Sequence, residues 1–298
     1  MSIYNQIKNN RTKTYILFTL FIIIFSGFFY LLGLAYDNGI GYFLLGLLIS
    51  IASSVGSYFY SDKLVLATTK AKEAKKEDYF DFFTVVENLS IASGVPTPKI
   101  YVIDDPSPNA FATGRDPEHA VVCATTGLLD MMERSELEGV IAHELSHIKN
   151  YDILVATVTA VLVGSISLVV DLIMRSIWWG GLSGSRKEEN RNPFIIFIFL
   201  FAIGVTPVVA SLIQLAISRK REYLADASGA LLTRNPSGLS RALIKISQYP
   251  YAVRSATTST AHLFIANPFK RKNARTLLAS LFSTHPPIEK RIEILNSM

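Results

Sequence analysis

Four long segments of the chain carry no charged residue, and they divide the sequence into alternating apolar and polar parts. They cover residues 14–36, 38–61, 153–170 and 193–218. Each is long enough to cross a hydrocarbon layer about 30 Å thick, for which about 17 helical residues suffice. We therefore predict four membrane helices, with Asp37 alone in a tight turn between the first two.

The polar parts contain shorter periodic patterns. Apolar residues recur at helical spacing over 78–96, and residues 98–104 have the composition of a short strand. Two more helices are expected, one from Asn235-Pro236 to residue 247 and one over 287–296, where Arg291 falls on the polar side. These elements predict an α+β membrane protein: four membrane helices and a mainly helical polar domain with a small β-sheet.

Composition also predicts the structure of three further segments. The lysine-rich residues 67–78 are expected as a solvated helix beside the bilayer, and the basic, Ser/Thr-rich residues 254–275 as a mobile loop near the functional site. Residues 120–125 have β-propensity. They form either an ordinary internal strand or a sheet edge onto which an extended chain can add through main-chain hydrogen bonds.

Composition agrees with a membrane location. Half of the 298 residues are apolar and only 18% are charged. The net charge of +5 comes from basic residues that flank the apolar segments, so anionic lipid headgroups are the expected partner and nucleic acid is not. The first segment lacks a small-residue cleavage site and is expected to be a retained anchor. The single cysteine, Cys123, excludes an internal disulfide.

The basic residues also predict an orientation. Lys8, Arg11 and Lys13 precede the first segment, and Lys63 opens a lysine-rich stretch after the second. The positive-inside rule places both flanks in the cytoplasm. The polar part up to Asp152 is therefore expected to be cytoplasmic.

Residues 143–147 read His-Glu-Leu-Ser-His at the end of a helix-patterned run. On a helix, His143 and His147 lie at positions i and i+4, so both imidazoles project from one face and can bind one zinc ion. Glu144, beside the first histidine, can reach a water bound to that ion. This spacing is typical of a zinc-dependent peptidase.

A third metal ligand is expected at the end of the fourth apolar segment. Glu222 and Asp226 are again at i and i+4, so one carboxylate can bind metal while the other accepts the free ring N–H of a histidine. The alternative is that Glu222 only pairs with Arg219 or Arg221 on a solvated helix end. If Glu222 binds the same ion, the chain must cross the membrane an even number of times between Tyr151 and Arg219. Two crossings and a hairpin that never fully spans both satisfy this condition.

Several separated motifs occur together in one order. They are residues 143–152 (HELSHIKNYD), residues 221–226 (REYLAD), residues 284–287 (THPP), residues 108–114 (PNAFATG) and residues 262–268 (HLFIANP). In this combination the chain resembles the bacterial HtpX family of heat-shock membrane zinc metallopeptidases, which is related to the CAAX-prenyl endopeptidases. The resemblance covers nearly the whole chain.

The resemblance implies a role for individual residues. His143, His147 and Glu222 would bind one zinc ion per chain, and Asp226 would orient a histidine. Glu144 would be the general base. His285 would stabilise the tetrahedral intermediate, although a helix-entry residue before Pro286 is the simpler interpretation of His285 by itself. Asn109 matches a substrate-side position.

The resemblance also implies a zincin-type domain, its boundaries, its substrates and its location in the cell. The expected parts are a membrane hairpin (1–61), a cytoplasmic catalytic part (62–152), a second hydrophobic hairpin (153–218) and a second cytoplasmic catalytic part (219–298). The expected substrates are misfolded or unassembled membrane proteins, including the chain itself. The expected location is a bacterial plasma membrane, where other quality-control proteases are candidate partners.

Two alternatives remain at this stage. An intramembrane-cleaving protease would bury the motif inside a spanning helix, whereas Glu138, Lys149 and Asp152 hold it at a polar border. A non-catalytic zinc-binding membrane scaffold would bind metal without proteolysis, and it would have no use for Glu144.

Overall fold

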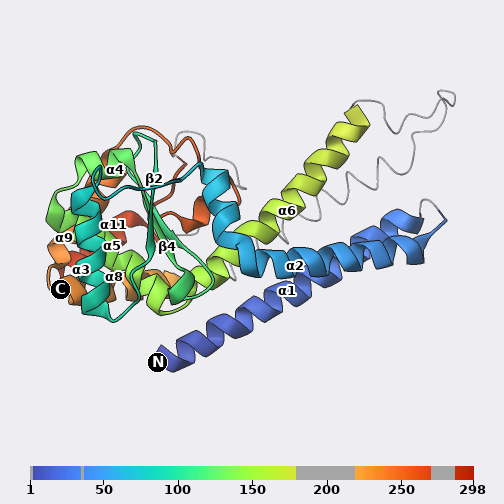
Figure 1. Cartoon of the computed structure of the whole chain (residues 1–298), viewed down its shortest axis with the longest axis horizontal. Coiled ribbons are helices and arrows are strands. Elements are labelled where there is room, and N and C mark those ends of the chain that lie inside the picture. Colours follow the sequence, from blue (N-terminus) through green and yellow to red (C-terminus); the bar gives the residue numbers. More distant parts are fainter. Residues whose placement is uncertain (1–2, 35–36, 179–218, 270–285) are drawn as a thin grey trace.

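A computed structural model of the chain describes residues 3–34, 37–178, 219–269 and 286–298. Within these ranges, three helices are long and apolar enough to cross a membrane. They are α1 (Ile3–Leu34), α2 (Gly39–Thr69) and the first part of α6 (Asp152–Trp178). Figure 1 shows these helices extending away from a rounded domain. The predicted fourth span, residues 193–218, lies outside the described residues.

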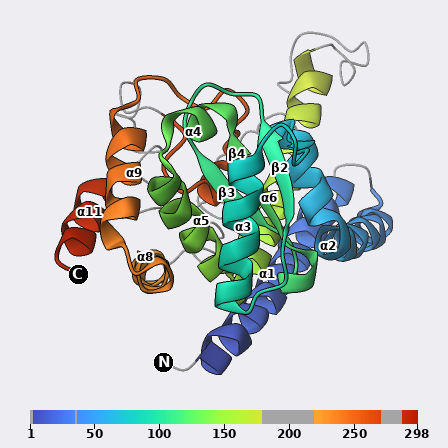
Figure 2. The same ribbon diagram turned by 60° about the vertical axis from the view of Figure 1, so that its left-hand side comes forward.

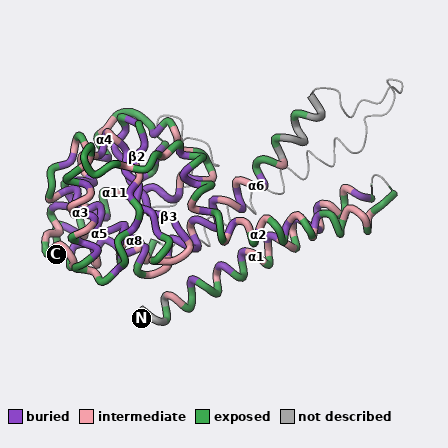
Figure 3. The backbone as a smooth tube through the Cα atoms, in the orientation of Figure 1, coloured by how far each residue is buried: buried purple, intermediate pink, exposed green. Residues whose placement is uncertain are grey.

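Helices α1 and α2 form the predicted hairpin. Asp37 adopts a positive φ of 54° in the turn, and the side chain of Asn38 caps α2 by accepting a hydrogen bond from the Gly41 amide at 3.1 Å. Apolar side chains of α1 such as Phe21 pack against α6 residues such as Val158. Away from this contact, both helices expose apolar faces (Figure 3), as expected for surfaces that meet lipid.

The rounded domain is built on a four-stranded sheet in the order β1-β2-β4-β3. The strands are β1 (Lys72–Glu73), β2 (Lys99–Ile103), β3 (Ala110–Thr113) and β4 (Val121–Thr125). β2 and β4 are parallel, and the other pairs are antiparallel. The proposal that residues 120–125 form a sheet edge is therefore wrong, because β4 pairs on both sides and all its residues are buried. The edge is β3.

The two faces of the sheet pack against different elements. Val102, Ala112 and Val122 pack with α3 (Phe80–Ser93) and α5 (Arg134–Lys149) in the main core. Phe111 and Cys123 point to the other face, where they meet the end of α2 and part of α6. The alternation of side chains along each strand thus joins the domain core to the membrane helices.

Helix α5 lies in the middle of the domain, beside α3, α8 (Arg219–Thr233) and α9 (Pro236–Gln248), as Figure 2 shows. Its first turn has a capping box between Glu133 and Glu136. A Cβ at Gly139 would lie 2.6 Å from the Leu239 backbone nitrogen, so glycine permits the close contact with α9. The remaining helices are α4 (Thr126–Met131), α11 (Ile288–Asn296) and the short 3-10 turns η1 (Pro117–His119) and η2 (Ala261–Leu263).

Two expectations about individual segments are corrected. Residues 67–78 are not a helix: Lys70 adopts φ 57° and ends α2, and the chain continues into β1. Arg291 is not on a solvated face of α11, because it is only 1% exposed and its guanidinium pairs with a carboxylate inside the domain.

Candidate active site

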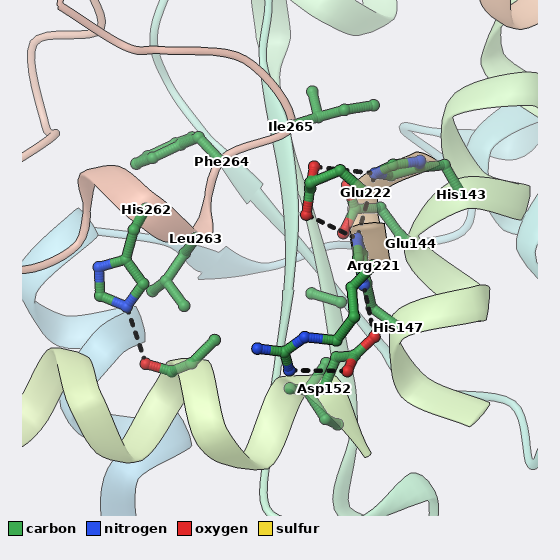
Figure 4. A pocket seen from close by; sticks show the side chains of 13 residues that line it. His143, Glu144, His147, Asp152, Arg221, Glu222, His262, Leu263, Phe264 and Ile265 are labelled. Carbon is green, nitrogen blue, oxygen red and sulfur yellow. Dashed lines mark hydrogen bonds and ion pairs between the residues drawn. The ribbon is translucent and has the colours of Figure 1, made fainter. Parts of the chain in front are cut away.

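Helices α5 and α8 bring three candidate metal ligands together. The Nε2 atoms of His143 and His147 are 3.2 Å apart. From α8, Glu222 places Oε2 at 3.9 Å from Nε2 of His143 and Oε1 at 3.5 Å from Nε2 of His147. The three ligand atoms all lie within 4.8 Å of one another (Figure 4). The spacing expected from the sequence therefore produces a convergent group on two helices.

A glycine sets how closely α8 approaches α5. A Cβ built on Gly229 would lie 3.0 Å from the backbone nitrogen of His143, which is closer than most real contacts. Without that side chain, α8 packs directly against the backbone that carries the first histidine, and Glu222 can reach both imidazoles.

Each histidine also faces a carboxylate with its other ring nitrogen. Nδ1 of His143 lies 2.9 Å from Oδ1 of Asp226, as the sequence led us to expect, and Nδ1 of His147 lies 3.0 Å from Oδ2 of Asp152. The second contact was not predicted. It depends on Tyr151, whose positive φ of 59° turns the chain between α5 and α6.

A buried arginine supports the first of these carboxylates. Arg291 of α11 donates from Nε and Nη2 to the two oxygens of Asp226, at 2.8 and 2.7 Å. It also donates from Nη1 to the Ile265 carbonyl at 2.8 Å. This fork geometry fixes the carboxylate that faces His143. The sequence offered no local signal for it, because Asp226 and Arg291 are 65 residues apart.

The electrostatics of the site favour a bound cation. Burial lowers the pKa of His147, but the hydrogen bond to Asp152 and the charge of Glu222 outweigh burial and raise this pKa to about 9. For Asp226, burial is outweighed by Arg291 and His143, which lower its pKa to about 2. The site thus stabilises a positive charge between its carboxylates, where a metal ion would replace the proton of His147.

The donor set fits zinc in two respects. Two imidazole nitrogens and one carboxylate are the ligands of a hydrolytic zinc site, which leaves a fourth position for water. Around the two histidines, the four carboxylates of Glu144, Asp152, Glu222 and Asp226 meet the two guanidinium groups of Arg221 and Arg291. Carboxylates therefore outnumber guanidinium groups around the histidines, which suits a bound cation.

Glu144 has the environment of a general base. It is 2% exposed, and its Oε1 atom accepts no hydrogen bond from the described residues. Burial raises the pKa of Glu144 to about 7, partly offset by His147 and assisted by the negative charge of Glu222. A carboxyl group that titrates near neutral pH can both take and return a proton.

A segment of the chain covers this pocket from the side opposite the ligands. His262, Leu263, Phe264 and Ile265 line the pocket, and Figure 4 shows this segment across it from the metal-ligand group, with the Phe264 ring directed away from the ligands. The Ile265 amide donates to the Ala110 carbonyl of the edge strand at 2.9 Å. The pocket has a volume of about 50 Å³ and is partly open, so it has room for a small ion and a water.

The two remaining predicted site residues are placed differently. Asn109 lies under the covering segment, donating from Nδ2 to the Ala266 carbonyl at 3.1 Å, and it lines a neighbouring cavity of about 320 Å³. His285 lies outside the described residues, so its expected role stays a prediction.

A hydrophobic hairpin joined to a domain with this donor set defines a membrane metallopeptidase. A family model described as Peptidase family M48 matches residues 81–298. The chain belongs to peptidase family M48. The expected relation to HtpX proteins is confirmed, and the non-catalytic scaffold is set aside.

Full-length relatives carry the description "Protease HtpX homolog". The protein from Caldanaerobacter subterraneus subsp. tengcongensis is 44% identical over 300 residues, which covers 100% of this chain and 98% of the relative. The protein from Dictyoglomus turgidum is 45% identical over 297 residues, and the match covers 99% and 94% of the two chains. The protein from Streptococcus uberis is 43% identical over 306 residues, covering 99% and 100%.

A solved structure shares the fold. The crystal structure of S. mikatae Ste24p matches with a TM-score of 0.50 and 19% sequence identity. The match covers 94% of this chain and 62% of the Ste24p chain, so this chain spans less than two thirds of that protein. This likeness supports the relation to CAAX-prenyl endopeptidases at the level of fold.

Proposed function

We propose that this membrane metallopeptidase is a zinc-dependent endopeptidase that hydrolyses misfolded or unassembled membrane proteins on the cytoplasmic side of a bacterial plasma membrane. The observation that carries the proposal is the convergence of His143, His147 and Glu222, with a carboxylate behind each histidine. The carboxylates hold each Nδ1 as a donor, so that each Nε2 presents its lone pair to the ion.

In the proposed reaction, the zinc ion and the side chains of the protein would have separate roles. Zinc at this position would lower the pKa of a bound water to roughly 7 and polarise the scissile carbonyl. Glu144 takes the proton of the attacking water at its carboxylate and later delivers it to the leaving amine. His285 is proposed to donate a hydrogen bond to the developing oxyanion.

The substrate proposal rests on the placement of the site. α5 is not among the described helices that could span a membrane, which argues against cleavage inside the bilayer. The pocket instead lies where α5, α6 and α8 meet beside the hairpin. Substrates that reach it would be extended segments of chains next to the membrane, including copies of this chain.

Metal dependence tests the proposal. Removing metal from the detergent-purified chain with a chelator should abolish cleavage of an unfolded protein such as casein, and one zinc per chain should restore it. The His147→Ala variant should bind no zinc at this site, while the matched variant His119→Ala should still bind one ion per chain. His119 belongs to an exposed group of possible ligands elsewhere. Full cleavage by metal-free protein would refute the proposal.

The proposed topology has a geometric basis. Arg221, two residues into α8, donates from Nη1 to Oδ1 of Asp152, at the start of α6, at 2.9 Å. This contact supports a topology in which the chain leaves from and returns to the same side of the membrane, with an even number of crossings between these residues. We propose that the chain crosses the membrane twice between these residues and four times in all. The proposed parts are then a membrane hairpin (1–61), a catalytic part (62–152), a second hairpin (153–218) and a second catalytic part (219–298).

Cysteine labelling would test this topology without a change to the native cysteine. Cys123 is fully buried in β4, and burial raises the pKa of its thiol. We expect no reaction of Cys123 with a maleimide in the folded chain and complete reaction in denaturant. A cysteine introduced at Gly184 should then react from outside the cell, whereas labelling only from the cytoplasm would exclude two crossings.

A further inference from the structure

Asn10 of the first membrane helix makes buried polar contacts with the catalytic domain. This side chain is 2% exposed, although its neighbours Asn9 and Arg11 are exposed. Its Nδ2 donates to Oδ1 of Asp152 at 2.8 Å and to the carbonyl of Asn150 at 2.9 Å. Its Oδ1 accepts from Nη1 of Arg221 at 3.2 Å.

These hydrogen bonds hold a carboxylate that in turn contacts a candidate metal ligand. Asp152 uses one oxygen, Oδ2, to face Nδ1 of His147 at 3.0 Å. Its other oxygen, Oδ1, is held by both Asn10 and Arg221. Arg221 itself precedes the candidate ligand Glu222. The single amide of Asn10 therefore contacts the supports of two ligands, which come from α5 and α8.

We infer that Asn10 is a positioning residue for the zinc site, so that α1 is part of the metal-binding structure as well as a membrane anchor. The inference rests on the proposed zinc site. A carboxylate behind a metal-bound histidine fixes the orientation and basicity of the ring, and its loss typically weakens metal binding 10- to 100-fold. Asn10 fixes that carboxylate, so its loss should have a smaller effect of the same kind.

An anchoring role alone does not account for this residue. An anchor needs only apolar side chains toward α2, α6 and lipid, whereas a buried amide is costly unless it is hydrogen-bonded. The amide is also chemically specific: it donates to a carboxylate and accepts from a guanidinium at once. Aspartate at this position could not donate to Asp152. The family model begins at residue 81 and so assigns nothing to α1.

Zinc affinity tests the inference directly. The full chain is purified with Asn10→Leu, which keeps the number and branching of heavy atoms, or Asn10→Ala, and zinc is titrated against a chromophoric chelator. We expect zinc binding roughly 3- to 10-fold weaker than in the wild type, below the 10- to 100-fold expected for Asp152→Asn. The matched control Asn9→Leu places the same side chain on the exposed neighbouring position and should leave zinc affinity unchanged.

The melting temperature of the metal-free chain separates positioning from folding. A residue with only a structural role would lower that temperature and leave the zinc affinity of the folded protein unchanged, which would overturn the inference. If Asn10→Leu fails to fold, Asn10→Ala provides the affinity. A wild-type chain that binds no zinc would instead refute the proposed function, and this inference with it.

Discussion

Glu144→Gln is expected to keep bound zinc and to lose roughly 10²- to 10⁴-fold in the rate of cleavage of an unfolded protein. Glutamine has the same shape as the buried glutamate, so the packing of α5 should persist. It cannot take a proton, however, and Oε1 of Glu144 faces the pocket without a hydrogen-bond partner among the described residues. The loss should therefore appear in kcat, with zinc content unchanged.

The same helix offers a matched control. Glu138 is a partly exposed residue of α5 that pairs with Arg134 at 3.3 Å, six residues before Glu144. Glu138→Gln should keep wild-type cleavage, because surface ion pairs contribute little to stability. The measurement is casein cleavage alongside zinc content for both variants. Wild-type cleavage by zinc-loaded Glu144→Gln would remove Glu144 from the mechanism.

Arg291→Met is expected to destabilise the catalytic domain by about 3–5 kcal/mol. Methionine has a similar length, but it leaves the carboxylate of Asp226 buried without its two charged hydrogen bonds of 2.8 and 2.7 Å. It also leaves the Ile265 carbonyl without its donor. For a domain of this size, the melting temperature should fall by roughly 6–20 °C.

The neighbouring residue again provides the control. Lys290 is exposed on the same helix, so Lys290→Met should change stability by less than about 0.5 kcal/mol. Thermal unfolding of the metal-free chain in detergent would give both values without any contribution from zinc. An unchanged melting temperature in Arg291→Met would show that the pair with Asp226 makes no net contribution to stability.

The parts of the site that sequence could predict are those with helical spacing. His143 and His147, and likewise Glu222 and Asp226, are four residues apart, so their shared helix faces follow from local geometry alone. The structure brings these two helices together as expected. Their roles in metal binding and catalysis stay predictions until metal is measured.

The parts that sequence could not predict depend on contacts between distant segments. Asn10 and Asp152 are 142 residues apart, and each is a polar residue beside an apolar segment, where solvation is the simpler expectation. Arg291 was expected to be solvated because it falls on the polar side of the helix predicted over 287–296. The order of the sheet is also non-local: β4 follows β3 in the chain but inserts between β2 and β3.

The contact between α1 and Asp152 also determines how deep the site lies. Asn10 and Leu34 are separated along α1 by a rise of about 36 Å, at about 1.5 Å per residue. With Leu34 at one boundary of a hydrocarbon layer about 30 Å thick, Asn10 lies about 6 Å beyond the other, or about 4 Å for a helix tilted by about 20°. On the topology proposed above, the candidate ligands would lie among the lipid headgroups. An extended chain advances about 3.3 Å per residue, so a polypeptide leaving the bilayer would reach the pocket within a few residues of its exit. The enzyme would then select the bond to cut by its distance from the membrane.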